Sequence, residues 1–298
     1  MAPHLSLRRG PDAISPTAHY TGHAWVRNKL SHPELATWQG RVLFGALEPP
    51  MALSRLLGGP TLEGALLARH RLIDRLLEHA IEAGKVRQVI EPACGMSPRG
   101  WRFSERYGER LTYVEGDLPE MAERKRRALA RMGSLNGCHR VVDLDVLRDT
   151  GPRSLRSLVD TLDRGEGLAI ITEGLLTYLD REQALASLRR FATALGEFRD
   201  GLYLSDLRLA GLNRGPAERA FGVVLSVFVR GRVHTHFVDE AEATAALKAV
   251  GFSQVRLHRG DTQPVEAVDR RDPGAEIIHV IEGTVGSGLA ATAAETDP

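Results

Sequence analysis

Short apolar runs alternate with amphipathic segments through the middle of the chain, and this alternation constrains the fold more than any other feature. The runs RQVIEPA, RLTYVEGD, HRVVDLD, GLAIITEG and DGLYLSDLRL predict strands over residues 87–93, 110–117, 139–145, 167–174 and 200–209. Strands that alternate with helices favour a mostly parallel sheet covered by helices on both faces.

The segments between these runs carry the signals that begin and end helices. Apolar residues recur at helical spacing over residues 62–83, where Thr61 can cap the helix and Gly84 can end it. Asp180 and Gln183 have the spacing of a capping box, and Pro119 suits the first turn of another helix. We therefore expect helices over about residues 62–83, 119–132, 153–162, 180–195, 217–229 and 239–250.

Two further strands are expected near the C-terminus, at FSQVRLH and AEIIHVIE, residues 252–258 and 275–282. They bring the total to about seven, and they can pair antiparallel. The predicted fold class is α/β: a Rossmann-like, doubly wound, seven-stranded and mostly parallel sheet with an antiparallel C-terminal strand and an N-terminal helical cap. We expect one domain over residues 1–298, with the cap at about 14–84, the core at 85–282 and a flexible tail at 283–298.

Charge and cysteine content narrow the class of partner. The 39 basic and 38 acidic residues give a net charge of +1, which supplies no electrostatic footprint for nucleic acid or for an anionic membrane. No apolar run is long enough for a membrane span, and the two cysteines, Cys94 and Cys138, show no zinc-site spacing. We expect a cytoplasmic protein without a metal that recognises a small molecule or a peptide, while the oligomeric state stays open.

The residues that leave the first four strands form an ordered series. In open α/β sheets the ligand lies beyond the carboxyl ends of the strands, near the point where the strand order reverses. Small residues follow the first strand and carboxylates follow the next three: Ala93, Cys94 and Gly95; Glu115 and Asp117; Asp143 and Asp145; Glu173 and Gly174. A lone acidic residue at a strand end is more often a helix cap or a solvated turn, so the series carries the interpretation rather than any one member.

This series fits a nucleoside better than a dinucleotide. A carboxylate after the second strand can accept both hydroxyls of a ribose, and one after the third can accept from the exocyclic amine of adenine. A pyrophosphate needs helix-start amides, whereas this loop has Pro98 and lacks a spaced glycine series. S-adenosylmethionine, which is cationic and carries no phosphate, is therefore the expected cofactor, with S-adenosylhomocysteine as its product.

At this point the segments resemble those of the leucine carboxyl methyltransferase family, which includes many bacterial enzymes that tailor polyketides and peptides. The resemblance rests on VIEPACGMSPRGWRF, YVEGDLPEMAERKRRAL, VVDLD and ITEGLLTYLDREQ, with ISPTA and LLARHRLID upstream. It implies that Arg69 pairs with the methionine carboxylate, Gly95 lies beneath the methionine part and Asp117 holds the ribose. It also implies that Asp143 and Leu144 frame the adenine and that Glu173 takes the amino group or neighbouring polar atoms of the cofactor. The expected cofactor site is completed by the adjacent residues Ala93, Glu115, Leu118 and Gly174.

Two short segments depart from the family pattern. Ala93-Cys94-Gly95 stands where the family has Gly-Ala-Gly, and Met96-Ser97 stands where it has Leu-Asp. The loss of the first glycine narrows the freedom of the backbone, and the loss of the aspartate removes a polar anchor.

The expected activity is transfer of a methyl group to an oxygen of a carboxylate or hydroxyl in a small metabolite or a peptide. A carboxylate acceptor needs only orientation, whereas an alcohol needs a general base. The acceptor-side candidates come from segments that the resemblance places near the transferred methyl group: Tyr178, Tyr20, His19, His23 and Arg27. Two alternatives are a non-catalytic binding or regulatory protein that keeps the fold, and a nicotinamide-dependent oxidoreductase.

Overall fold

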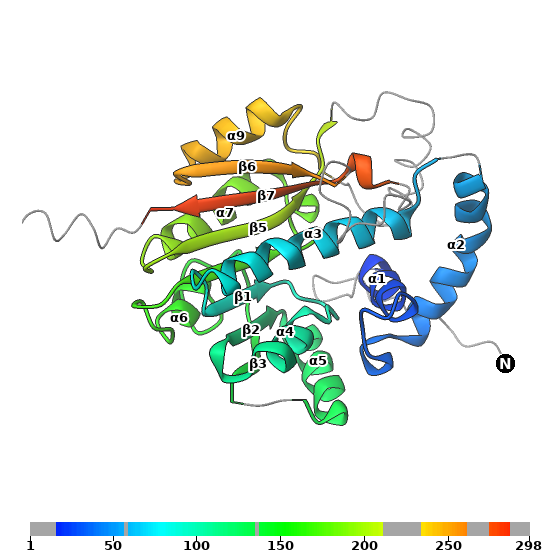
Figure 1. The fold of residues 1–298 in the computed structure, drawn as a ribbon, viewed down its shortest axis with the longest axis horizontal. Helices are drawn as coiled ribbons and strands as arrows, with labels where there is room; N and C mark the ends of the chain where they lie inside the picture. Colours follow the sequence, from blue (N-terminus) through cyan, green and yellow to red (C-terminus); the bar gives the residue numbers. More distant parts are fainter. Residues whose placement is uncertain (1–15, 57–58, 135–136, 211–233, 261–273, 287–298) are drawn as a thin grey trace, which may run out of the picture.

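The structure is a computed structural model that describes residues 16–56, 59–134, 137–210, 234–260 and 274–286. Its centre is a seven-stranded sheet in the order β3-β2-β1-β4-β5-β7-β6 (Figure 1). The strands are β1 Gln88–Pro92, β2 Thr112–Asp117, β3 His139–Asp143, β4 Leu168–Thr172, β5 Gly201–Leu207, β6 Gln254–Arg259 and β7 His279–Val285. Only β7 runs against its neighbours, since β5 and β6 both pair with it antiparallel while the other pairs are parallel. The predicted fold class is confirmed.

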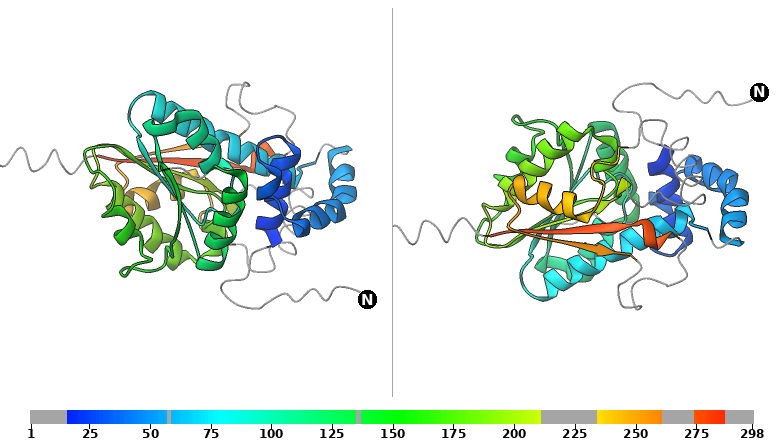
Figure 2. Two further views of the ribbon diagram at one scale, coloured as in Figure 1. Left: turned by 90° about the horizontal axis from the view of Figure 1, so that it is seen from below. Right: turned by 90° about the horizontal axis from the view of Figure 1, so that it is seen from above.

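Helices cover both faces of this sheet (Figure 2). One face packs against α3 Leu62–Glu82, α4 Arg99–Tyr107 and α5 Pro119–Met132, and the other packs against α6 Leu155–Val159, α7 Arg181–Leu195 and α9 Glu240–Ala249. Because alternate residues of a strand face opposite sides, each buried strand supplies apolar groups to both layers. The sheet is therefore the middle layer of a three-layer molecule.

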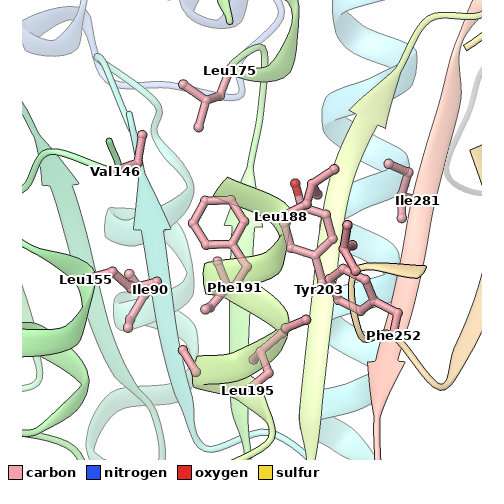
Figure 3. Close-up of a cluster of buried hydrophobic side chains, with 14 of the residues drawn as sticks. Ile90, Val146, Leu155, Leu175, Leu188, Phe191, Leu195, Tyr203, Phe252 and Ile281 are labelled. Atoms are coloured by element: carbon pink, nitrogen blue, oxygen red, sulfur yellow. The ribbon is translucent and has the colours of Figure 1, made fainter. Parts of the chain in front are cut away.

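The larger core lies between the sheet and α6, α7 and α9 (Figure 3). Tyr203 of β5 stacks between Phe191 of α7 and Phe252, with ring centroids 5.6 and 5.4 Å apart. These three rings tie the central strands to the antiparallel edge. The opposite core is built from α3, α4 and the other side of the same strands.

The N-terminal cap consists of α1 Pro16–Arg27, a 3-10 turn at Pro33–Leu35 and α2 Trp38–Leu56. In Figure 1 both helices lie beyond the ends toward which β1 and β5 point. Tyr20 of α1 and Phe44 of α2 stack at 5.1 Å and form a small core with the first turn of α3. The cap thus covers the edge of the sheet where the strand exits meet.

Helix ends follow their local sequence signals closely. Thr61 caps α3 through the Gly64 amide, and the capping box of Asp180 with Gln183 forms in full. Asp239 caps α9 by accepting from the Glu242 amide. Among the described residues, no helix is both long and apolar enough to cross a bilayer.

Three of the elements expected from the sequence differ from those in the structure. The segment 275–282 does not form one strand, because Ala275–Ile277 is a 3-10 turn and β7 begins at His279. The strand then continues to Val285, so residues 283–285 belong to the sheet and not to the expected tail. The helix expected over 153–162 is a single short turn, α6, and the one expected over 217–229 lies outside the described residues.

Candidate functional site

The strand order reverses between β1 and β4, which places the exits of these two strands side by side. Every second side chain of a strand points to the same face of the sheet, so the position of a residue within its strand determines which side chains it meets there. Five carboxylates share the face covered by α3, α4 and α5, and they come from four strands or strand exits: Glu91, Glu115, Asp117, Glu173 and Asp206. The sheet therefore presents an acidic layer beneath these helices.

The loop after β1 is shaped by two left-handed residues. Ala93 has φ +53° and Gly95 has φ +52°, a region that an alanine adopts only at a cost. A Cβ atom built on Gly95 would meet no described atom within 4 Å, so the described residues leave open space above this glycine. The alanine that replaces the family's first glycine keeps the turn, and it does so in a strained conformation.

Asp117 at the end of β2 holds this loop in place. Its carboxylate accepts the Gly95 amide at 2.7 Å and the Leu118 amide at 2.8 Å. Burial raises the pKa of Asp117 and outweighs the two amides, which lower it. Each oxygen has used one acceptor position on the backbone and retains another.

Glu115, two residues earlier, has a different environment. Its side chain is fully buried and accepts from Lys125 at 2.5 Å, and it lies 2.9 Å from Nε2 of His139. Burial raises its pKa, but Lys125 and His139 outweigh this effect and keep the pKa below its usual value. A carboxylate enclosed in this way joins α5 to β2 and β3 and presents no exposed surface to a ligand.

Asp143 and Leu144 follow β3. Asp143 is half-exposed and pairs with Arg126 at 3.1 Å, while the Leu144 side chain packs against Gly116. The Leu144 amide donates to the Asp117 carbonyl at 2.8 Å, which joins the second and third strand exits.

Arg69 on α3 is largely buried, whereas an arginine on a helix is usually exposed at the surface. Its Nε donates to Glu173 at 3.0 Å and its Nη1 to Asp206 at 3.1 Å, with 15% of the side chain exposed. Asp206 also accepts the Gly174 amide at 2.6 Å. A Cβ on Gly174, which has φ +77°, would lie 3.3 Å from the Arg69 guanidinium. The absence of a side chain at Gly174 leaves space for the Arg69 guanidinium.

Glu173 is the most heavily coordinated carboxylate of the site. Besides Arg69, it accepts from Arg99 at 2.6 Å and lies 2.8 Å from Nδ1 of His70. Burial would raise its pKa, but His70, Arg99 and Arg69 outweigh burial and hold the pKa well below the usual range. Glu173 is therefore ionised and locked at the exit of β4.

The acceptor-side candidates fall on two elements. His19, Tyr20, His23 and Arg27 lie on α1, whereas Tyr178 lies on the 3-10 turn Leu176–Tyr178, near enough to Arg69 to help raise the pKa of its guanidinium. Nδ1 of His19 lies 2.8 Å from Thr37, and burial, helped by Arg124, lowers the pKa of His19 to about 4.

Their environments separate these candidates further. Tyr20 is buried against Phe44 and burial raises its pKa, whereas Arg27 is largely exposed beside Glu48. The ring of His23 meets Phe44 edge-on. Tyr178 is 43% exposed and is the most accessible hydroxyl of the set.

Several ionisable residues of this layer do not figure among the expected site residues, including His70, Glu91, Arg99 and Asp206. Asp206 could have been found by extending the series of strand exits to the fifth strand. Arg99 begins the helix after the first loop, and nothing in its local sequence marks it as buried.

Two hollows border the described residues near these elements. One, of about 540 Å³, lies between residues 34–39 and α5, and Met96, next to Gly95, forms part of its wall. The other, of about 360 Å³, lies between α6 and α7 and shares no lining residue with the strand exits. No cluster of three or more His, Cys, Asp or Glu suited to a metal ion occurs in the described part of the chain.

Known proteins resemble this chain over much of its length. A Mycolicibacterium gilvum protein is 36% identical over 132 residues, which cover 44% of this chain and 39% of that protein. A Mycobacterium ulcerans protein is 36% identical over 177 residues, which cover 58% and 53%. Both are named as candidate S-adenosyl-L-methionine-dependent methyltransferases. The chain thus spans about half, or less, of the length of these relatives.

A structural neighbour agrees on the fold. The crystal structure of a DUF574 family protein from Streptomyces avermitilis superposes with a TM-score of 0.61 at 14% identity, covering 90% of this chain and 97% of that one. At such identity the likeness shows the fold alone. Residues 30–192, more than half of the chain, match the family model described as leucine carboxyl methyltransferase. The chain belongs to the leucine carboxyl methyltransferase family.

Proposed function

We propose that this protein binds S-adenosylmethionine at the exits of β1, β2 and β4 and transfers its methyl group to an acceptor oxygen. The acceptor is a carboxylate or hydroxyl of a small metabolite or a peptide. Family membership over residues 30–192 carries this proposal. The relatives' names and the acidic layer of the sheet support it.

The residues at the strand exits fit the nucleoside part of this cofactor. The open space above Gly95 leaves its backbone accessible, and the acceptor positions that Asp117 retains suit the two hydroxyls of a ribose. Asp143 and Leu144 stand at the next exit, where the adenine is expected. Glu115 is withdrawn from this set because Lys125 and His139 enclose its carboxylate.

The residues around Arg69 fit the amino-acid part. Nη2 of Arg69 makes no hydrogen bond or ion pair with any residue that the structure describes, so this nitrogen is available to a carboxylate of the ligand. Glu173, which accepts from Nε of the same guanidinium, suits an ammonium group. An arginine beside a carboxylate matches a zwitterion.

When bound, S-adenosylmethionine supplies an electrophilic methyl group on a positively charged sulfur. The task of the protein is to orient the acceptor in line with that methyl group and to exclude water, which requires positioning more than acid–base chemistry. The excess of carboxylates in this layer favours a cationic ligand. The N-terminal helices cover this edge of the sheet and contribute to its shelter (Figure 1).

Tyr178 is the acceptor-side residue that we favour. It is accessible, and it follows the β4 exit close to Arg69, so its hydroxyl can orient an acceptor oxygen. His19 is a weak base because burial lowers its pKa to about 4. Tyr20, His23 and Arg27 all contact Phe44 and stabilise the cap from α1. This arrangement favours a carboxylate, which is already ionised and needs orientation only.

Isothermal titration calorimetry with S-adenosylmethionine and S-adenosylhomocysteine tests the proposal. Asp117→Asn should weaken both ligands by roughly 10-fold or more, since it removes the charge that strengthens hydrogen bonds to the ribose. Asp145→Asn is the matched control, because Asp145 also follows a strand but contacts Leu147 and Arg148 at the surface. A wild-type protein that binds neither ligand would refute the proposal.

The two alternatives predict different outcomes. A nicotinamide-dependent oxidoreductase would bind NADH in a fluorescence titration, although the Gly95 amide is already bonded to the Asp117 carboxylate, which disfavours a pyrophosphate there. A regulatory binder would bind S-adenosylhomocysteine and transfer no methyl group across a panel of acceptors. We place the enzyme in the cytoplasm, without a nucleic-acid partner, in keeping with a content of only two cysteines and a near-neutral charge.

A further inference from the structure

A single arginine, Arg99, is enclosed by three carboxylates at the point where the strand order reverses. Its Nε donates to Asp74 at 2.6 Å, its Nη1 to Glu91 at 2.7 Å and its Nη2 to Glu173 at 2.6 Å. These carboxylates come from α3, β1 and the exit of β4, and Arg99 itself has no exposed surface. A buried guanidinium survives only when its charge is matched in this way.

The bond to Glu173 links this buried cluster to the surface of the site. Glu173 receives Arg99 on Oε2 and Arg69 on Oε1, so the two arginines grip opposite oxygens of one carboxylate. A rotation of Glu173 away from Arg99 would carry Oε1 away from Arg69. The position of the partly exposed arginine therefore depends on the fully buried one.

Asp206 supports the same pair from the other side. It accepts from Nη1 of Arg69 at 3.1 Å and from the Gly174 amide at 2.6 Å. Since Gly174 follows Glu173 directly, Asp206 fixes both Arg69 and the backbone that carries Glu173. Nη2 of Arg69 has no partner among the described residues, while Nε and Nη1 are both held.

We infer that Arg99 and Asp206 are positioning residues that clamp the Glu173–Arg69 pair in the arrangement that recognises the amino-acid part of the cofactor. This inference rests on the proposed function. The nucleoside part is recognised separately, because Asp117 bonds to Gly95 and Leu118 and not to any member of the clamp. Loosening the clamp should therefore affect one half of the ligand and spare the other.

Two ligands distinguish these halves. S-adenosylhomocysteine carries both parts, whereas 5′-methylthioadenosine keeps the adenosine and the sulfur and lacks the amino acid. We expect the wild-type protein to bind S-adenosylhomocysteine at least 10-fold more tightly than 5′-methylthioadenosine in calorimetric titrations. Arg99→Lys keeps the charge but cannot reach three carboxylates at once, and Asp206→Asn keeps the shape but loses the charge.

Each variant should lower the affinity for S-adenosylhomocysteine by 10-fold or more and change the affinity for 5′-methylthioadenosine by less than 3-fold. Arg102→Gln is the matched control, because Arg102 lies on the same helix and pairs with the same Asp74 at 2.6 Å without touching Glu173. It should leave both affinities within 3-fold. If Arg99→Lys does not fold, Asp206→Asn decides the question.

Equal losses for the two ligands, or no loss, in a folded variant would overturn the inference, as would a wild-type protein that binds both ligands equally well. A wild-type protein that binds neither ligand would instead refute the proposed function. The ratio of the two affinities is informative because a general loss of structure would weaken both ligands together.

Discussion

Gly100 on α4 is the position where one added methyl group should do the most damage. A Cβ atom there would lie 2.4 Å from Cδ and 2.6 Å from Oε1 of Glu115. Glu115 cannot give way, because Lys125 and His139 hold its carboxylate in a fully buried site. To restore an ordinary contact, α4 has to move from the sheet by about 1 Å.

The size of the effect follows from what this movement breaks. Overpacking a core costs about 1–3 kcal/mol, and separating the buried Arg99 of α4 from its three carboxylates costs about 3–5 kcal/mol when the separation is complete. Partial separation by about 1 Å places Gly100→Ala near 3 kcal/mol of lost unfolding free energy. Urea denaturation followed by circular dichroism measures this directly.

Gly45 on α2 provides the matched control. It also lies in a helix, but it is exposed and a Cβ atom there would meet nothing within 4 Å. Gly45→Ala should therefore raise the unfolding free energy by about 0.5–1 kcal/mol through helix propensity alone. If Gly100→Ala changed stability by less than about 1 kcal/mol, the close packing of α4 on the Glu115 carboxylate would be refuted.

Three further predictions concern the loop, the cap and Arg69. Ala93→Gly should raise the unfolding free energy by about 0.5–1 kcal/mol, because φ is +53° at this residue; an unchanged urea midpoint would contradict the strain. Stability should fall as pH drops from 6.5 toward 4, since the pKa of His19 is about 4 when folded and 6.5 in its ordinary state, so the unfolded chain takes up the proton first. His19→Gln should flatten this dependence in urea titrations at pH 7 and pH 5, and an equally steep loss would count against it. Gly174→Ala should weaken S-adenosylhomocysteine in calorimetry by displacing Arg69, whereas retained affinity would show that the arginine adapts.

The sheet and most of its helices could be predicted because their signals are local. The capping box at Asp180 and the cap at Thr61 need only a few neighbouring residues, and both form as expected. The strand expected over 275–282 was wrong at its start. Its apolar residues suit a strand, but Gly274, with φ +107°, begins a 3-10 turn that contains the first three residues of the segment.

The site was harder to predict because the local sequence does not show how deeply each residue of a strand is buried. Glu115 and Asp117 are two residues apart on one face, yet the first is enclosed and the second reaches the loop. Arg99 illustrates the same limit, since its three carboxylates lie 25, 8 and 74 residues away along the chain. Only the assembled fold shows that an arginine after a proline is the most buried cation at the switch point.

The reversed strand β7 has a consequence for how the molecule is made. It lies between β5 and β6, so β6 has no neighbour in the described sheet until β7 has been synthesised. The edge of β5 likewise stays open while the intervening residues leave the ribosome. During synthesis the sheet therefore stays incomplete, with exposed strand edges, until β7 inserts between β5 and β6.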